Sequence, residues 1–401
     1  MATRRICCGR CEAMNYSTTS VREITSPPFE AAATAPVSLA GADKREVEID
    51  VLRGWCIVMM IVMHVGTTTR LNAVVHPHQY VTAASGFVFL AGWLLGQISG
   101  RRLANDGPRA AYRRIWSRAL KLWAAHCVLM FGTVILHETT GLLPMSPVSE
   151  TGGWANALWM IPTLRLQSEY YLNILPVYIV FVALTPLWLE AMRRNLTALL
   201  MACSGALYLA AQYFPDLWQL AHPASGARIF SLPGWQFLYF SGLALGYHRK
   251  KLAGEFWPAH RQWLLPVCLT LSAALFILAQ FQRPSHPSLH LLNDTTDSFW
   301  FNRVTHAPGR LVVFFTTIIP CYLLVRYCLR NEKFPGPLRW LATMGRASLY
   351  CFIVHLIFAI AFRAINTWSW PLWSQEVLTA GTVVLTWLMA RHQVLARVIP
   401  N

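Results

Sequence analysis

Charged side chains are scarce in this sequence. Asp, Glu, Lys and Arg make up 13% of the 401 residues, and only 18 residues are acidic. A soluble domain usually carries about 25% charged residues. Hydrophobic residues reach 55%, with 17 Trp and 20 Phe, which would leave too much apolar surface on a protein that faces water on every side. The scarcity of charge excludes an ordinary soluble protein and predicts an all-α polytopic membrane protein.

The sequence has no internal repeat and no appended soluble domain, and its N-terminal segment has no apolar run. Residues 1–43 contain no continuous apolar stretch and are rich in Pro, Ala and Ser, which predicts a disordered cytoplasmic tail and no cleaved secretory signal. We expect one transmembrane domain over 44–391 and a short cytoplasmic tail over 392–401. The tail cysteines lack a fourth nearby ligand for a tetrahedral site, so we expect reduced thiols and no metal at Cys7, Cys8 and Cys11.

Ten apolar segments are long enough, or nearly so, to cross the hydrocarbon core as helices, which takes about 20 residues. The sixth is the shortest. The predicted spans are 50–69, 80–99, 115–137, 170–190, 196–214, 233–247, 263–281, 310–329, 347–366 and 375–390.

The basic residues are distributed unevenly around these segments. Of the 34 Lys and Arg, 27 fall in or at the edges of alternate connections, 6 fall in the others, and Arg363 lies in the ninth span. This positive-inside pattern predicts that both termini are cytoplasmic. The formal net charge of +16 is thereby explained by membrane topology, so we expect membrane lipid and no nucleic acid as a partner.

Carboxylates are absent from the middles of spans two to ten, but histidines are not. An ionisable side chain at mid-bilayer costs about 2.5–3.5 kcal/mol on insertion scales, which makes His64, His126 and His355 candidates for function. A hydrogen-bonded contact between helices is the alternative for each of them.

His64 shares a helix face with two charged residues. Asp50 and Arg53 lie 14 and 11 residues before it, which places all three within roughly 60° around the helix at 100° per residue. The rise from Arg53 to His64 is about 16 Å, so the two side chains cannot touch and a long ligand could lie between them. An interfacial Asp50–Arg53 ion pair is the alternative.

Two further groups lie in the connections. Arg113, Arg114 and Arg118 belong to a basic inner segment that could bind a polyphosphate or could simply set topology. On the predicted outer side, His76 or His78 could act as a general base near neutral pH. An HxH metal site is weak here because no carboxylate or cysteine lies in that loop.

Five strings together resemble the OpgC-type membrane acyltransferases, which succinylate periplasmic glucans and are distantly related to the acyltransferase-3 and heparan-glucosaminide acetyltransferase groups. The resemblance covers about residues 45–391. The strings are KREVEIDVLRGWCIVMMIVMHVG, ASGFVFLAGWLLG, RRIWSRALKLWAAHCVL, YLNILPVYIVFVALTPLWL and ASLYCFIVHL.

The resemblance implies an O-acyltransferase of the inner membrane. A cytoplasmic acyl-CoA, most simply succinyl-CoA, would donate its acyl group to a periplasmic glucan or related glycan, without a metal. Similar enzymes have a polar residue at the place of His64, a histidine at that of His76 or His78, and a basic start to the third span. An acidic residue is common in the family where this chain has Asn173, a departure that concerns the substrate more than the fold.

Combining the residues with the resemblance gives a first mechanism. Phosphates of acyl-CoA would rest on Arg53, Arg113, Arg114 and Arg118, while His64 or His78 would deprotonate a sugar hydroxyl as it attacks the thioester. Transfer through an acyl-histidine intermediate is the second route. Donors near Ser85 could stabilise the oxyanion. The remaining substrate-binding candidates are Asp50, Asn173, Tyr178, His126 and His355.

Two other functional classes remain open. The sequence also leaves the oligomeric state open. A transporter or flippase for a glycan or small anion could use the polar helix face as its pathway, although carboxylates at the midplane and an inverted repeat are missing. A non-catalytic membrane scaffold is the other possibility, and its partners would still modify the product after His64 is replaced by alanine. If the protein is the enzyme, that replacement should abolish the modification.

Overall fold

The computed structural model describes residues 46–76, 78–143, 148, 152–167, 172–214, 222–223, 230–282, 292 and 294–394. The chain divides into two compact units, Met1–Arg45 and Glu46–Asn401. All described residues belong to the second unit. The predicted N-terminal tail, with its cysteines, and most of the predicted C-terminal tail lie outside the described residues.

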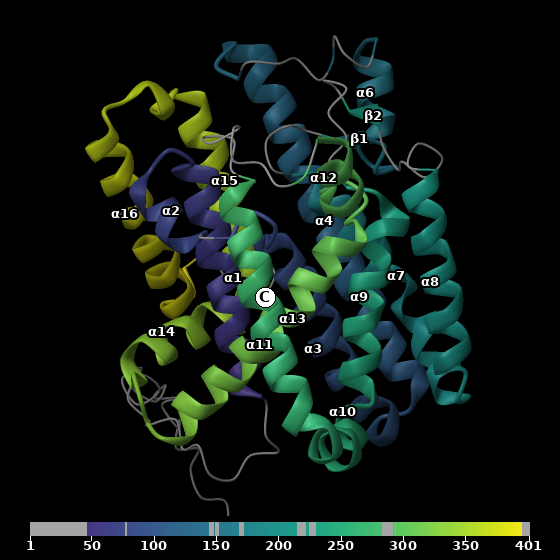
Figure 1. Ribbon diagram of the computed structural model, residues 1–401. Helices are drawn as coiled ribbons and strands as arrows, with labels where there is room; N and C mark the ends of the chain where they lie inside the picture. Colours follow the sequence, from purple (N-terminus) through teal and green to yellow (C-terminus); the bar gives the residue numbers. More distant parts are fainter. Residues whose placement is uncertain are drawn as a thin grey trace, which may run out of the picture. The chain divides into compact units, whose positions relative to one another are not determined.

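The described part is almost entirely helical (Figure 1). Its longer helices are α1 (Val47–Val65), α3 (Ala83–Asn105), α4 (Pro108–Thr140), α7 (Ile174–Arg193), α8 (Thr197–Tyr213), α9 (Leu232–Tyr247), α11 (Trp257–Phe281), α13 (Pro308–Arg330), α14 (Pro335–Arg346), α15 (Ser348–Ala364) and α16 (Leu372–Arg391). Short elements connect them: α2 (Arg70–Val75), α6 (Trp154–Met160), α10 (Arg249–Lys251), the π-helix η1 (Leu252–Phe256), α12 (Asp294–Phe301) and the 3-10 helix η3 (Thr367–Ser369). Strands β1 (Leu166–Gln167) and β2 (His222–Pro223) form one parallel pair.

Each of the ten predicted spans coincides with a helix. Five helical stretches are long and apolar enough to cross a membrane by themselves: α3, α4, α7, Arg249–Phe281 and α13. A sixth arises if α14 and α15, which meet at an 85° bend, are taken as one broken span. The protein is therefore a helical membrane protein. The count of ten and the cytoplasmic termini stay predictions, in part because α1 carries three charged residues in its first two turns.

α1 lies at the centre of the helical unit. It packs against α3, α13, α14, α15 and α16, and most of its residues are buried. Its contact with α14 is close because two glycines lie there: a Cβ on Gly54 would meet the Leu341 carbonyl oxygen at 2.0 Å, and one on Gly345 would meet the Asp50 carbonyl oxygen at 1.7 Å. The first turns of α1, with Asp50 and Arg53, are therefore covered by α14.

α3 and α9 approach each other equally closely through two glycine pairs. A Cβ on Gly92 or Gly96 would come within 2.2 Å of a carbonyl oxygen of α9, and one on Gly242 or Gly246 would come as close to a carbonyl oxygen of α3. The small-xxx-small spacing of these residues predicts such packing. The structure confirms it.

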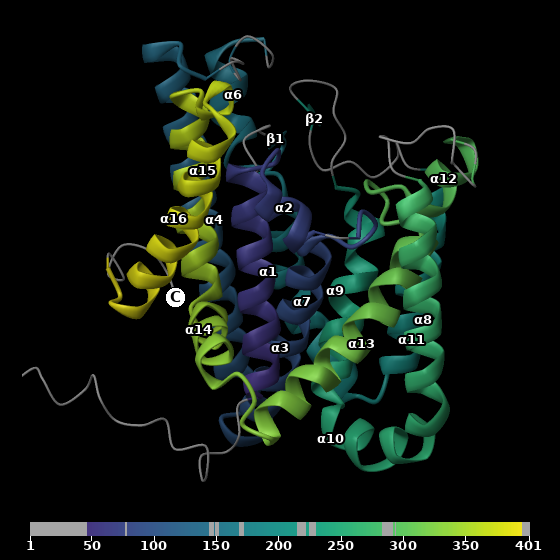
Figure 2. The same cartoon turned by 60° about the vertical axis from the view of Figure 1, so that its left-hand side comes forward.

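The short connecting elements gather at two ends of the helices (Figures 1 and 2). α6, β1, β2 and α12 lie at one end, here called the outer end, and α10 lies at the opposite end. The outer end carries the connections that the charge pattern assigns to the far side of the membrane.

Candidate active site

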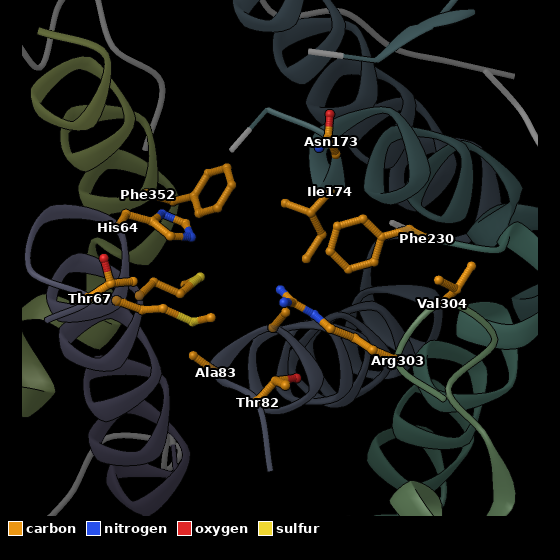
Figure 3. A pocket seen from close by; sticks show the side chains of 13 residues that line it. His64, Thr67, Thr82, Ala83, Asn173, Ile174, Phe230, Arg303, Val304 and Phe352 are labelled. Carbon is orange, nitrogen blue, oxygen red and sulfur yellow. The ribbon is translucent and has the colours of Figure 1, made fainter. Parts of the chain in front are cut away.

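A cavity of about 380 Å³ opens between helix ends near the outer end (Figure 3). Residues from six separate parts of the chain form its wall. They are Met60, Met63, His64, Thr67, Thr82, Ala83, Ala84, Asn173, Ile174, Phe230, Arg303, Val304 and Phe352.

Local sequence explains why these residues face one space. In α1, Met60, Met63 and His64 have i, i+3, i+4 spacing and therefore lie on one helix face. α3 begins at Ala83 because the Thr82 side chain accepts a hydrogen bond from the Ser85 backbone N–H and so caps the helix. Asn173 stands immediately before α7, and Arg303 lies in the turn before α13.

His64 forms a pair with His355 of α15. Its Nδ1 lies 3.1 Å from His355 Nε2, with the rings stacked at 5.2 Å between centroids. His355 is fully buried, whereas His64 is half-buried and borders the cavity. Because one of two neutral imidazoles must donate in such a contact, the pair fixes the orientation of the His64 ring. The structure thus joins two residues that the sequence placed 291 positions apart.

Arg303 is the cationic residue facing His64 across the cavity. Figure 3 shows its guanidinium reaching in from the side opposite His64, with Asn173 at the rim. Arg303 is exposed although the residues that follow it, Thr305 and His306, are buried. Protein atoms close to the guanidinium group of Arg303 displace part of its hydration, and this desolvation lowers its pKa. The Asn173 Oδ1 is buried without a hydrogen-bond partner among the described residues.

Ser85 lies one layer behind the cavity wall. Its Oγ is 3.0 Å from His306 Nε2 and 2.7 Å from Thr82 Oγ1, and it is 4% exposed. Burial, with a contribution from Arg310, lowers the pKa of His306 to about 3. His306 is therefore neutral at pH 7, and the Ser85–His306 contact supports the Thr82 corner of the cavity.

The charged side chains near the start of α1 contact residues of neighbouring helices. Arg53 donates to the Ser348 hydroxyl at the start of α15, and Arg346 Nε lies 3.8 Å from an Asp50 carboxylate oxygen. Both α1 residues are buried. α1 and α15 are thus bridged at two levels, by Arg53–Ser348 and by His64–His355, along the polar face that the sequence predicts.

The predicted phosphate-binding arginines lie on the first part of α4. Arg113 and Arg114 are exposed, and Arg114 forms an ion pair with Asp106 at 3.1 Å. Arg118 reaches inward and its Nη2 lies 3.4 Å from the hydroxyl of Tyr178, which is buried. Neither these three arginines nor Tyr178 lines the cavity.

Three predicted histidines also lie outside the cavity. His76 follows α2, and burial lowers the pKa of its imidazole. His78 is buried beside Tyr80 and Phe276, and burial lowers its pKa to about 4. His126 is fully buried in α4. The structure brings His64, His355 and Asn173 to one region, with His76 close enough to His64 to act on it electrostatically, and leaves His78 and His126 elsewhere.

Sequence reasoning missed Arg303, His306 and Phe230. One signal for the first two was present: Arg303, His306 and Arg310 fall within eight residues, in the turn before α13 and the first turn of that helix, where the positive-inside pattern expects few basic residues. Phe230 carried no such signal. Among the described residues, no three His, Cys, Asp or Glu side chains are grouped to hold a metal.

Comparison with known proteins gives one match. Residues 45–397 match the model of a protein family described as OpgC protein. No curated protein and no solved structure matches the chain.

Proposed function

The chain belongs to the OpgC protein family, and on this premise we propose that it is a transmembrane O-acyltransferase that modifies a glucan. The acyl group would come from cytoplasmic acyl-CoA, most simply succinyl-CoA. The acceptor would be a sugar hydroxyl of a periplasmic glucan or related glycan at the inner membrane. In this proposal membrane lipid surrounds the helices. The proposed reaction uses no metal.

The observation that carries this proposal is the His64–His355 pair beside the cavity. An imidazole is the commonest general base in proteins, and here one nitrogen of His64 is held by a second imidazole while the ring borders a space open to a ligand. A purely structural histidine pair would not need a cavity at its edge. In this proposal His64 is the base that activates the nucleophile, and His355 is the group that orients it.

The proposed step uses the two nitrogens of His64 differently. With Nδ1–H donated to His355 Nε2, the other nitrogen, Nε2, takes the proton of the sugar hydroxyl as its oxygen attacks the thioester carbonyl carbon. The C–O bond forms, the C–S bond breaks, and the departing thiolate takes the proton back from His64. The products are the sugar ester and free coenzyme A thiol.

Donor and acceptor would approach from opposite ends. The cavity is lined by residues of the outer connections, which suits an acceptor arriving from the periplasm. The arginines of α4 lie on the segment that the charge pattern assigns to the cytoplasm, which suits the phosphates of acyl-CoA. Arg53 lies between these regions, and its bond to Ser348 would have to be shared with, or exchanged for, the donor arm.

Acceptor-dependent release of thiol is the direct test. Purified protein in detergent or nanodiscs is expected to release coenzyme A from succinyl-CoA when a neutral glucan is present, and much less in its absence. Thiol is followed with a chromogenic disulfide, and esterified glucan is identified by mass spectrometry. Movement of glucan across a vesicle membrane without thiol release would contradict an enzyme and favour a transporter.

The α4 arginines give a separate prediction for the donor. Replacing Arg114 and Arg118 together by alanine is expected to raise the KM for acyl-CoA about 10-fold, because each can give a charge-assisted hydrogen bond to phosphate. The kcat should change little, since neither side chain lines the cavity. Arg261→Ala, on α11, is the matched control for loss of positive charge. An unchanged KM in the double variant would remove both arginines from the donor site.

A further inference from the structure

The cavity wall is apolar apart from a few positions. Eight of its residues are Met, Ala, Ile, Val or Phe, and the neutral polar ones are Thr67, Thr82 and Asn173. Into this surface projects the guanidinium of Arg303 (Figure 3). An arginine in protein stays charged, so a full positive charge lies inside an otherwise nearly neutral space.

Among the residues that the structure describes, no acidic group compensates that charge. None of the described Asp or Glu residues lines the cavity, and no ion pair or hydrogen bond within those ranges involves the Arg303 side chain. Its charged neighbour Arg310, in the first turn of α13, is also basic and is hydrogen-bonded to the backbone oxygens of Phe301 and Tyr80. A guanidinium that projects into a cavity, with no counter-ion among the described residues, favours an anionic ligand.

We propose that Arg303 binds the free carboxylate of the acyl group that is transferred, and so selects dicarboxylic over monocarboxylic donors. This assignment rests on the proposed acyltransferase function. The thioester carbonyl would lie near His64, the methylenes would lie along Met60, Ile174 and Phe230, and the distal carboxylate would meet Arg303 in a bidentate contact. Arg303 is then a specificity-determining residue.

The chemistry of the wall favours the acyl group over the sugar as the partner of Arg303. A sugar presents hydroxyls around its ring and would need many polar partners, whereas this cavity offers three neutral polar side chains and a large apolar surface. A short methylene chain with a charge at one end matches that distribution. The sugar would then reach His64 from the mouth of the cavity.

Two donors that differ in one terminal group test the assignment. Wild-type protein, Arg303→Gln and Arg303→Lys are assayed with succinyl-CoA and with butyryl-CoA, on the same neutral glucan. In Arg303→Gln, the ratio of kcat/KM for succinyl-CoA to that for butyryl-CoA is expected to fall about 10- to 100-fold, the effect of losing one charged hydrogen-bond partner. Arg303→Lys should retain an intermediate ratio, because lysine keeps the charge without the planar fork.

Binding without turnover separates this inference from the proposed function. Monomethyl succinate, which has an ester and a free carboxylate, should raise the melting temperature of wild-type protein, and methyl butyrate should not. Arg303→Gln should melt at the wild-type temperature without ligand, since Arg303 contacts no acceptor among the described residues, and should lose the response to monomethyl succinate.

The outcomes are distinct. A catalytically silent wild-type protein that still shows the carboxylate-dependent shift through Arg303 would overturn the acyltransferase reaction and leave the anion site in place. Equal losses with both donors in Arg303→Gln would overturn the assignment. The same assays are repeated with a glucan that carries phosphate groups. If Arg303→Gln loses activity only with that acceptor, the assignment is also overturned, because Arg303 would then bind the acceptor.

Discussion

Replacing His64 by glutamine is expected to lower kcat for acyl transfer about 10²- to 10⁴-fold, the contribution usual for a general base. Glutamine keeps much of the volume and can still hydrogen-bond His355, but it cannot take a proton. KM for acyl-CoA should change by less than threefold, because the predicted phosphate contacts lie on α4. Thiol release and ester formation on the glucan, measured on purified protein, give both constants.

Two matched variants distinguish a base from a packing residue. His78→Gln removes another buried histidine of the same outer end that does not line the cavity, and should retain the wild-type rate. His355→Gln keeps an acceptor for His64 Nδ1–H and should retain more activity than His355→Leu, which has none. If His64→Gln retains full activity at a normal melting temperature, His64 is not the base.

The helices of this protein follow from its sequence for a simple physical reason. In lipid every backbone polar group must be satisfied within its own segment, so long apolar stretches can only be helices. All ten predicted segments coincide with helices. Their boundaries differ where polar residues extend a helix beyond its apolar part: α4 begins seven residues before the predicted 115–137, among the arginines. The bend between α14 and α15 had no such signal.

The site was predictable only in part. Helical periodicity shows which residues of one helix share a face, and it correctly placed Asp50, Arg53 and His64 together. It does not show which helix packs against that face, so the partners Ser348 and His355 emerge only from the tertiary structure. Arg303 lies in a turn, where no periodicity indicates direction, and His78 falls outside the cavity although it is close to it in sequence.

A large effect on stability is expected from Gly246→Ala. Alanine normally stabilises a helix by about 0.8–1 kcal/mol relative to glycine. At this position, however, the new Cβ would lie 2.0 Å from the carbonyl oxygen of Trp93 in α3 and 2.8 Å from its carbonyl carbon. These are backbone atoms, so no change of rotamer relieves the overlap and α3 and α9 must separate. We expect destabilisation of about 1–3 kcal/mol or more, seen as a lower melting temperature in detergent.

Gly132→Ala in α4 is the matched control, because no heavy atom lies within 4 Å of the position that its Cβ would take. It should melt at or slightly above the wild-type temperature, opposite in sign to Gly246→Ala. The Gly246→Ala variant, unlike this control, should also lose transfer activity. The N-terminal end of α3, where Thr82 and Ala83 form part of the cavity wall, lies about 16 Å from Trp93 along the helix axis. A Gly246→Ala protein that melts like the control would show that α3 and α9 do not pack backbone to backbone, and the position of the cavity wall relative to His64 would then need another explanation.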